Sequence, residues 1–301
     1  MTDDAWYLAH PLAERVAAGP PRGRTDGELG RLRLKMWRQE PVHARRPERL
    51  AEHLESHGLD EERFVGVLGE DPAAVAARFD GPPAFARRIT EAWNRPGETP
   101  AEGDEALGFA VIAAPLLRDA VERVRTEVAA LVGNHPHLTA DALASRLGAG
   151  PVDTVNMLVA RTLVLELNVS RLRGELTGDD PHERYHHFLH LLRRPERALA
   201  VLREYPVLAR DVVRAIDDWT VSRIEFARHL VADHAELAAR LGELGDLAEL
   251  SFGAGDSHRG GRSVAAVRFA SGARVMYKPR RLSVDRHFQE LLLWLNERGD
   301  H

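Results

Sequence analysis

The chain of 301 residues contains no cysteine. Disulfide bonds, thiolate zinc sites and cysteine nucleophiles are therefore excluded within it. Lysine is almost absent as well, because only Lys35 and Lys278 occur among 41 basic residues. Arginine fills nearly every other basic position, so a lysine at position 278 suggests a need for a compact ammonium rather than a planar guanidinium.

The sequence also lacks a dominant charge of one sign and a long hydrophobic run. Its formal net charge is -5 with both signs mixed along the chain, whereas a nucleic-acid-binding protein carries a basic stripe. The apolar run 109–117 is too short to span a bilayer, and the acidic N-terminus has no signal-peptide pattern. We therefore expect a cytoplasmic globular protein with no nucleic-acid partner and no membrane span.

Residues 1 to about 245 show the periodicity of amphipathic helices. Apolar residues recur at helical spacing over residues 60–68, 83–94, 106–131 and 152–176. Residues 95–104 contain two prolines and two glycines and no large apolar residue, which predicts a linker. The expected organisation is a helical region at 1–94, a linker at 95–105, a second helical region at 106–245 and a final lobe at 246–301. Within the second region, residues 203–242 are expected to form two or three helices that support the lobe.

Strands are expected in the final lobe. The stretch from Gly253 to Lys278 is typical of a strand, a glycine-rich loop, a second strand, a two-residue turn at Ser271-Gly272 and a third strand. A helix follows, with apolar positions at Val284, Phe288, Leu291, Leu292 and Leu295. The predicted fold class is therefore α+β and mostly α, with a short antiparallel sheet.

Glycines in the segment 251–262 form a candidate anion-binding loop, because a residue without Cβ lets backbone N–H groups approach a phosphate closely. The pattern is neither G-x-G-x-x-G nor a Walker A loop, and the glycines alone are weak evidence. The order of elements is more informative. A strand, a glycine loop, a strand, a strand that carries lysine and a helix form the opening of a protein-kinase-like N-lobe.

Four motifs occur in order in this lobe: Gly255-Asp-Ser-His-Arg-Gly-Gly-Arg-Ser-Val264, Phe269-Ala-Ser-Gly272, Tyr277-Lys-Pro-Arg280 and Phe288-Gln-Glu-Leu-Leu-Leu-Trp-Leu-Asn296. Three more lie upstream: Gly174-Glu-Leu-Thr-Gly178, Glu183-Arg-Tyr185 and Tyr205-Pro-Val-Leu-Ala-Arg210. Together they resemble the dehydratase domain of class II lanthipeptide synthetases. The resemblance covers most of the chain and is strongest from about Leu199 onward.

The resemblance implies a lipid-kinase-like fold that uses ATP and Mg²⁺ to phosphorylate Ser and Thr of a ribosomally made precursor peptide. Phosphate is then eliminated, which leaves dehydroalanine and dehydrobutyrine. By motif, Lys278 would contact the ATP phosphates, and Asp256 and His258 would act in elimination. The remaining residues implied at the nucleotide are Gly255, Ser257, Gly260, Gly261 and, as acidic partner of the lysine, Glu290.

Two of these assignments have structural alternatives. A histidine titrates near neutral pH and an aspartate two residues away biases its protonation, which suits Asp256 and His258 to proton transfer. The same residues commonly hydrogen-bond the backbone of a turn. Glu290 neighbours the apolar stripe of its predicted helix, so a solvated surface carboxylate is as consistent with the pattern as an ion pair with Lys278.

A kinase-like site also needs a catalytic loop with its base, an asparagine and a further aspartate for the metal. The sequence does not supply them after Lys278, so we expect the N-terminal, truncated part of a synthetase. The Mg²⁺ ligands are then expected downstream, and Zn²⁺ belongs to a cyclase domain that this chain lacks. We expect this polypeptide alone to be inactive and the missing C-terminal part of the synthetase to be its partner.

Two other functions remain open. The first is a non-catalytic helical module that binds a leader peptide or a partner chain. The second is a kinase-like phosphotransferase with a small-molecule substrate. A metal site is not predicted: His182, His186 and His190 share one face of a helix, but i to i+8 spans about 12 Å, too far for one ion to bind all three. A polar helix face is the main expectation there, and a two-ligand site is the alternative.

Overall fold

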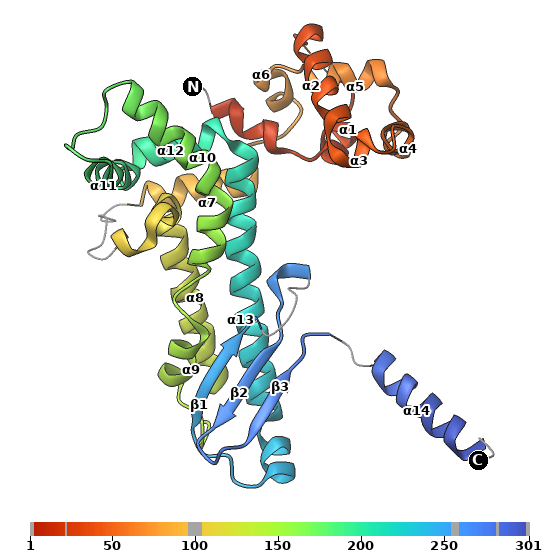
Figure 1. Cartoon of the computed structure of the whole chain (residues 1–301), viewed down its shortest axis with the longest axis vertical. Coiled ribbons are helices and arrows are strands. Elements are labelled where there is room, and N and C mark those ends of the chain that lie inside the picture. The colour runs from red at the N-terminus through yellow and green to blue at the C-terminus, as the bar shows by residue number, and fades with distance from the viewer. Residues whose placement is uncertain (1–2, 22, 96–103, 254–258, 281–282, 299–301) are drawn as a thin grey trace. The chain divides into compact units, whose positions relative to one another are not determined.

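The computed structural model describes residues 3–21, 23–95, 104–253, 259–280 and 283–298, without the side chains of residues 104, 105 and 259. These residues are mostly helical and contain one three-stranded antiparallel sheet, which confirms the predicted fold class (Figure 1). The elements are η1 (Asp3–Ala9), α1 (Leu12–Ala17), α2 (Gly27–Gln39), α3 (Pro41–Ala44), α4 (Glu48–Ser56), α5 (Glu61–Leu68), α6 (Pro72–Ala76), α7 (Ala84–Trp93), η2 (Asp104–Ala113), α8 (Ala114–Val132), α9 (Ala140–Leu147), α10 (Val152–Leu172), α11 (Pro181–Leu192), α12 (Pro195–Glu204), α13 (Pro206–Leu241), β1 (Leu247–Phe252), η3 (Arg259–Gly261), β2 (Ala265–Phe269), β3 (Arg274–Tyr277) and α14 (Ser283–Arg298).

The chain divides into two compact units. The first unit comprises Met1–Leu117 and Pro151–Arg214, and the second comprises Arg118–Gly150 and Ala215–His301. The boundaries expected from the sequence, at residues 94, 105 and 245, stay a prediction. Within the described ranges, no helix combines the length and the apolar character that crossing a bilayer requires.

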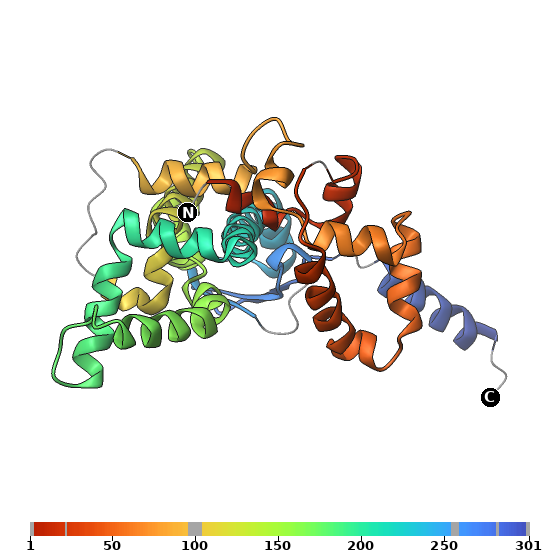
Figure 2. The same ribbon diagram turned by 90° about the horizontal axis from the view of Figure 1, so that it is seen from above.

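In the first unit, helices α2, α4 and α5 pack together, as the red and orange ribbons of Figure 2 show. Their helical periodicity brings five apolar side chains into one buried cluster: Leu34, Leu50, Leu54, Phe64 and Leu68. Asp26 begins α2 by accepting hydrogen bonds from the backbone N–H groups of Glu28 and Leu29, and Asp60 begins α5 in the same way through Arg63. Side-chain caps of this kind satisfy backbone donors that a helix leaves unpaired at its start.

The first unit also buries a carboxylate. Glu70 is 2% exposed, and its two oxygens lie 2.6 Å from Nη2 of Arg15 and 2.5 Å from Nη2 of Arg78. Arg78 further donates to the backbone carbonyl of Gly19 at 2.5 Å. This cluster joins α1, the end of α5 and the segment after α6, so residues about 60 positions apart in sequence depend on one buried charge.

The helix expected over residues 106–131 is wrong over residues 106–113. Residues 104–113 form the 3-10 helix η2, which is kinked at Gly108 with φ 58° and ψ -136°, and the α-helix starts only at Ala114. Asn156 of α10 holds the kink: its Oδ1 accepts from the Ala110 N–H and its Nδ2 donates to the Leu107 carbonyl, both at 2.9 Å. The Asn156 amide thus replaces helix hydrogen bonds on both sides of Gly108. Together with the left-handed backbone of this glycine, it favours a break in the helix.

Two other expectations about helices need correction. The helix predicted over residues 152–176 ends at Leu172, because Gly174 takes a left-handed φ of 71° just beyond it. The region 203–242 holds one helix of 36 residues, α13, rather than two or three. No proline or glycine follows Pro206 before Gly242, so nothing in the sequence interrupts the helix.

The Glu70 cluster leads to a prediction about stability. Replacement of Glu70 by alanine leaves Arg15 and Arg78 as buried charges without their carboxylate, and we expect the free energy of unfolding to fall by about 3–5 kcal/mol. Urea denaturation followed by circular dichroism measures this change. The exposed Glu62 is the matched control, and Glu62→Ala should shift stability by less than about 0.5 kcal/mol. Equal effects of the two substitutions would contradict the structural role of the cluster.

Candidate functional site

The sheet of the second unit is covered on one face by α13. Phe226 of α13 meets the ring of Phe252 in β1 and the ring of Tyr277 in β3 edge to face, with centroid distances of 5.2 and 5.1 Å. Ala265, Val267 and Phe269 of β2 alternate toward the buried side. Because a small sheet needs a covered apolar face to be stable, α13 determines where the ends of the three strands lie.

Arg223 fixes the relation between α13, β1 and α9. Its guanidinium lies 3.4 Å from the ring centroid of Phe252, and its Nε donates to the carbonyl of Leu147 at 3.1 Å. Burial lowers the pKa of Arg223 to about 10, so the side chain stays cationic at neutral pH. A cation stacked on a ring and held by a helix-end carbonyl orients the end of β1.

Strand register brings the two predicted parts of the site to one end of the sheet. Phe252 pairs with Ala265, and Ala265 pairs with Tyr277. The glycine-rich segment connects β1 and β2 at this end, and Lys278 follows Tyr277 at the same end. Strands β1, β2 and β3 agree with the predicted order of elements, although β1 ends at Phe252, before Gly253.

The hairpin between β2 and β3 is one residue longer than predicted. The Phe269 N–H donates to the Ala273 carbonyl at 3.0 Å, which leaves three residues in the loop instead of the expected two. Gly272 takes a φ of 89°, in the left-handed region typical of the last position in three-residue hairpin loops.

Part of the predicted loop lies outside the described residues: Gly255, Asp256, Ser257 and His258. The end of the loop is described. Gly260 and Gly261 both have left-handed backbones, with φ of 72° and 65°. A Cβ at Gly261 would lie 3.3 Å from the Cβ of Asp218 on α13, so this glycine allows close packing against a helix. That packing by itself explains why residue 261 is a glycine, without any role in phosphate binding being needed.

An ion pair anchors the residue that follows these glycines. Nη2 and Nε of Arg262 lie 2.6 and 2.8 Å from one carboxylate oxygen of Glu225 on α13. This carboxylate raises the pKa of Arg262 above its ordinary value, first through the hydrogen bond. The end of the glycine-rich segment is therefore fixed to α13 at two points, Asp218 and Glu225.

Lys278 is exposed and borders a hollow of about 360 Å³ between α13 and β3. The polar residues of this hollow are Lys278, Tyr277, His229 and Asp233, and its apolar residues include Phe226 and Val275. His229 Nδ1 lies 3.1 Å from the Tyr277 hydroxyl. Burial raises the pKa of Tyr277, and the nearby carboxylates of Glu225 and Asp233 add to this effect, so the phenol is neutral and available as a donor.

Sequence reasoning missed the polar residues that α13 supplies, namely Asp218, Glu225, His229 and Asp233. A signal was available, because the first three recur at spacings of seven and four residues and therefore share one face of a helix. We expected several helices over residues 203–242, and this periodicity becomes apparent only when the region is a single helix.

Glu290 lies on α14, and the ion pair that the structure describes for it is with Arg286. Its Oε1 is 3.6 Å from Nε of Arg286, one helical turn away, and 62% of its side chain is exposed. Every described residue of α14 is exposed, including Val284 at 77% and Phe288 at 55%. The pairing of Glu290 with the lysine stays a prediction.

A nucleotide phosphate fits this end of the sheet in one respect, since the ammonium of Lys278 is accessible to an anion. Magnesium ligands are a different case. Among the residues that the structure describes, no three His, Asp or Glu side chains form a group able to hold a metal ion. On α11, His182 and His186 do approach each other, with 3.1 Å between their Nε2 atoms, and both are exposed.

Residues 205–301 match a protein family described as a domain of unknown function, DUF4135. No curated protein matches the chain. The DUF4135 match begins one residue before α13 and includes all three strands and α14, so it contains Lys278, Glu290 and the polar face of α13. It covers the C-terminal third of the chain, where the motifs found in the sequence are densest.

Two upstream motifs lie outside the DUF4135 match, and the structure brings them together in the first unit. A Cβ at Gly178 would lie 2.6 Å from the Cβ of Glu183, and the guanidinium of Arg184 donates to the Gly178 carbonyl at 2.9 Å. The third motif begins with Tyr205, whose hydroxyl donates to Glu166 Oε1 at 2.8 Å. Burial and this carboxylate raise the pKa of Tyr205 to about 12.

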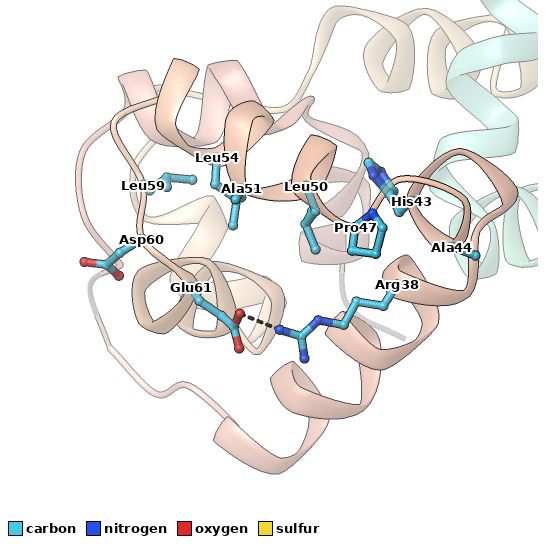
Figure 3. A pocket seen from close by; sticks show the side chains of 10 residues that line it. All are labelled: Arg38, His43, Ala44, Pro47, Leu50, Ala51, Leu54, Leu59, Asp60 and Glu61. Carbon is cyan, nitrogen blue, oxygen red and sulfur yellow. Dashed lines mark hydrogen bonds and ion pairs between the residues drawn. The ribbon is translucent and has the colours of Figure 1, made fainter.

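A second hollow, of about 630 Å³, lies among α2, α4 and α5 in the first unit (Figure 3). Its apolar lining comes from Pro47, Leu50, Ala51, Leu54 and Leu59. Figure 3 shows the ion pair between Arg38 and Glu61 across one side, with 2.5 Å between Nη2 and Oε2. None of the residues predicted for nucleotide binding lies here, and the lining is better suited to apolar side chains than to phosphate.

The packing of Gly261 on Asp218 predicts the effect of a small substitution. Gly261→Ala places a Cβ in a left-handed backbone and against α13, and we expect the protein to lose about 1–2 kcal/mol of stability. Thermal unfolding measures the change. Gly66→Ala is the matched control, since this glycine lies within α5 with open space around it, and it should gain about 0.5–1 kcal/mol. A tolerated alanine at position 261 would argue against tight packing of the loop end on α13.

Proposed function

We propose that this chain acts in lanthipeptide biosynthesis, as part of a dehydratase that phosphorylates Ser and Thr of a precursor peptide with ATP and then eliminates the phosphate. The observation that carries the proposal is the match of residues 205–301 to DUF4135, a domain found in lanthipeptide synthetases. The sequence motifs that resemble these enzymes lie mainly in the same segment.

The arrangement of the second unit supports a nucleotide at the end of the sheet where Lys278 and the glycine-rich segment meet. In phosphoryl transfer, protein groups mainly position the phosphates and offset their charge. The ammonium of Lys278 would supply that charge. Arg262, fixed by Glu225, would hold the end of the glycine-rich segment on α13.

Elimination needs a group that removes the α-proton and a group that stabilises the departing phosphate. We assign the proton transfer to His258 as the titrating group, with Asp256 two residues away biasing its protonation. ATP supplies the transferred phosphoryl group when it is bound.

The two lysines allow a direct test of the nucleotide assignment. Replacement of Lys278 by alanine removes the cation that would meet the phosphates, so affinity for Mg-ATP should fall roughly 10- to 100-fold. Lys35, an exposed residue of α2, is the matched control, and Lys35→Ala should leave the affinity unchanged. Isothermal titration calorimetry with Mg-ATP on the full chain measures both.

Transfer of the substitution into a complete synthetase tests catalysis. There, Lys278→Ala should abolish phosphorylation of the precursor peptide, read by mass spectrometry, while binding of the peptide is retained. Normal phosphorylation by this variant contradicts the proposal.

A second candidate function is a non-catalytic module that binds a leader peptide or a partner chain. The hollow of Figure 3 favours it, because an apolar lining beside polar groups suits the apolar face of a bound peptide helix. Its wall is built from short helices that are stabilised by a buried cluster of their own. This function needs neither Lys278 nor a nucleotide.

Substitution within the hollow separates the two candidates. Ala51 is exposed and lines the hollow, so Ala51→Trp fills it without disturbing the buried cluster. If the hollow holds the peptide, affinity for the precursor peptide should fall at least about tenfold, which fluorescence anisotropy measures. Glu52→Gln, at the next exposed position of α4, is the control. An unchanged affinity in Ala51→Trp removes the support for the module.

A further inference from the structure

Three histidines gather in the second unit and have no role in the proposed function. His135 and His137 lie between α8 and α9, and His234 lies on α13. The ring centroid of His234 is 4.7 Å from that of His135 and 5.6 Å from that of His137. His234 also meets the ring of Phe269 in β2 edge to face at 6.1 Å. The cluster therefore joins a connecting segment, a long helix and a strand.

His234 is the buried member of the cluster. It is 3% exposed, and its Nε2 is buried without a hydrogen-bond partner. Burial of an imidazole without a partner has a cost, and burial of an imidazolium without a counterion costs far more. His137 stacks on His234 with ring planes 13° apart, so a positive charge on both rings would create direct repulsion.

His135 adds a contact of its own through Nδ1. The backbone N–H of His137 donates a hydrogen bond to this nitrogen at 3.2 Å. This bond closes the turn between the two histidines, whose rings both lie beside His234. Proton uptake at His234 places a charge among these rings and weakens the contact that holds the segment on α13.

We propose that His135, His137 and His234 form a proton-sensitive joint. While the imidazoles are neutral, this joint holds the segment between α8 and α9 against α13 and β2. Below neutral pH it releases the segment. The joint controls the position of α9. Arg146 of this helix donates to the Ala248 carbonyl in β1 at 3.2 Å, and its Leu147 carbonyl accepts from Arg223 of α13. Release of the segment loosens α9 from β1.

The groups that face His234 determine the direction of the pH dependence. His135 and His137 face His234 from the connecting segment, and the uncharged Phe269 faces it from β2. The pKa of His234 is lowered from 6.5, first by burial and then by the two histidines. Because the folded-state pKa lies below the unfolded one, the joint contributes its full stability above pH 6.5 and loses it as the pH falls through the lowered value.

Hydrogen–deuterium exchange of the full chain, corrected for intrinsic rates, tests the joint. Between pH 7.5 and pH 5.5, protection of amides in residues 134–147 should fall several-fold, toward the limit of about tenfold that one histidine with an unfolded pKa of 6.5 sets at pH 5.5. A local measurement is needed because the pKa of His53 in the first unit is also lowered by burial, so global unfolding would mix two effects.

Substitutions identify the histidines responsible. His234→Phe keeps a ring beside Phe269 and cannot take a proton, so protection at pH 5.5 should return to its value at pH 7.5. Should that variant not fold, His137→Gln changes an exposed ring of the cluster and should reduce the pH response at least about threefold. His190→Gln, an exposed histidine of α11, should keep the full response.

Three results would overturn the proposal. The first is equal protection at both pH values in the unsubstituted chain. The second is a full pH response in the folded cluster variants. The third is protection that zinc chloride increases and EDTA removes at pH 7.5, because the residues would then serve as metal ligands rather than as a proton-sensitive contact. In the described part of the chain the cluster does not have the arrangement of a metal site.

Discussion

Contact between α13 and one face of the sheet is the constraint on which the second unit depends. Three short strands cannot bury an apolar face by themselves, and Phe226 provides the surface against which Phe252 and Tyr277 pack. The same helix supplies Arg223 to β1, Glu225 to the end of the glycine-rich segment and His234 to the joint with the α8–α9 segment. One uninterrupted helix therefore sets the positions of elements that are distant in sequence.

Much of this architecture can be predicted from local patterns. Helix α11 contains the three histidines that were expected on one helix, and it begins where local residues favour a start, since Pro181 occupies its first turn and Asp180 caps it by accepting from the Glu183 N–H. The glycine at position 272 takes the left-handed backbone that its place in a hairpin suggests. Such features depend on a few neighbouring residues, and the sequence displays those residues directly.

Other features depend on partners far along the chain and could not be found in this way. The break at Gly108 is stabilised by Asn156, 46 residues beyond Ala110, and no local pattern links them. The polar face of α13 becomes visible only when the helix is recognised as continuous. The place of Lys278 directly after the third strand and the order of the strands were predictable. The anchoring of Arg262 by Glu225 was not, because an ion pair across 37 residues requires the fold.

The buried carboxylate of Glu70 has a practical consequence for work with shortened versions of this protein. Its two guanidinium partners lie on either side of it in sequence, and the earlier one, Arg15, comes from the second helical element of the chain. Removal of the first twenty residues would take Arg15 away from the buried Glu70 carboxylate and leave its charge to be neutralised by Arg78. Shorter versions intended for crystallisation or binding assays should therefore retain α1, even where their purpose concerns only the lobe at the other end of the sequence.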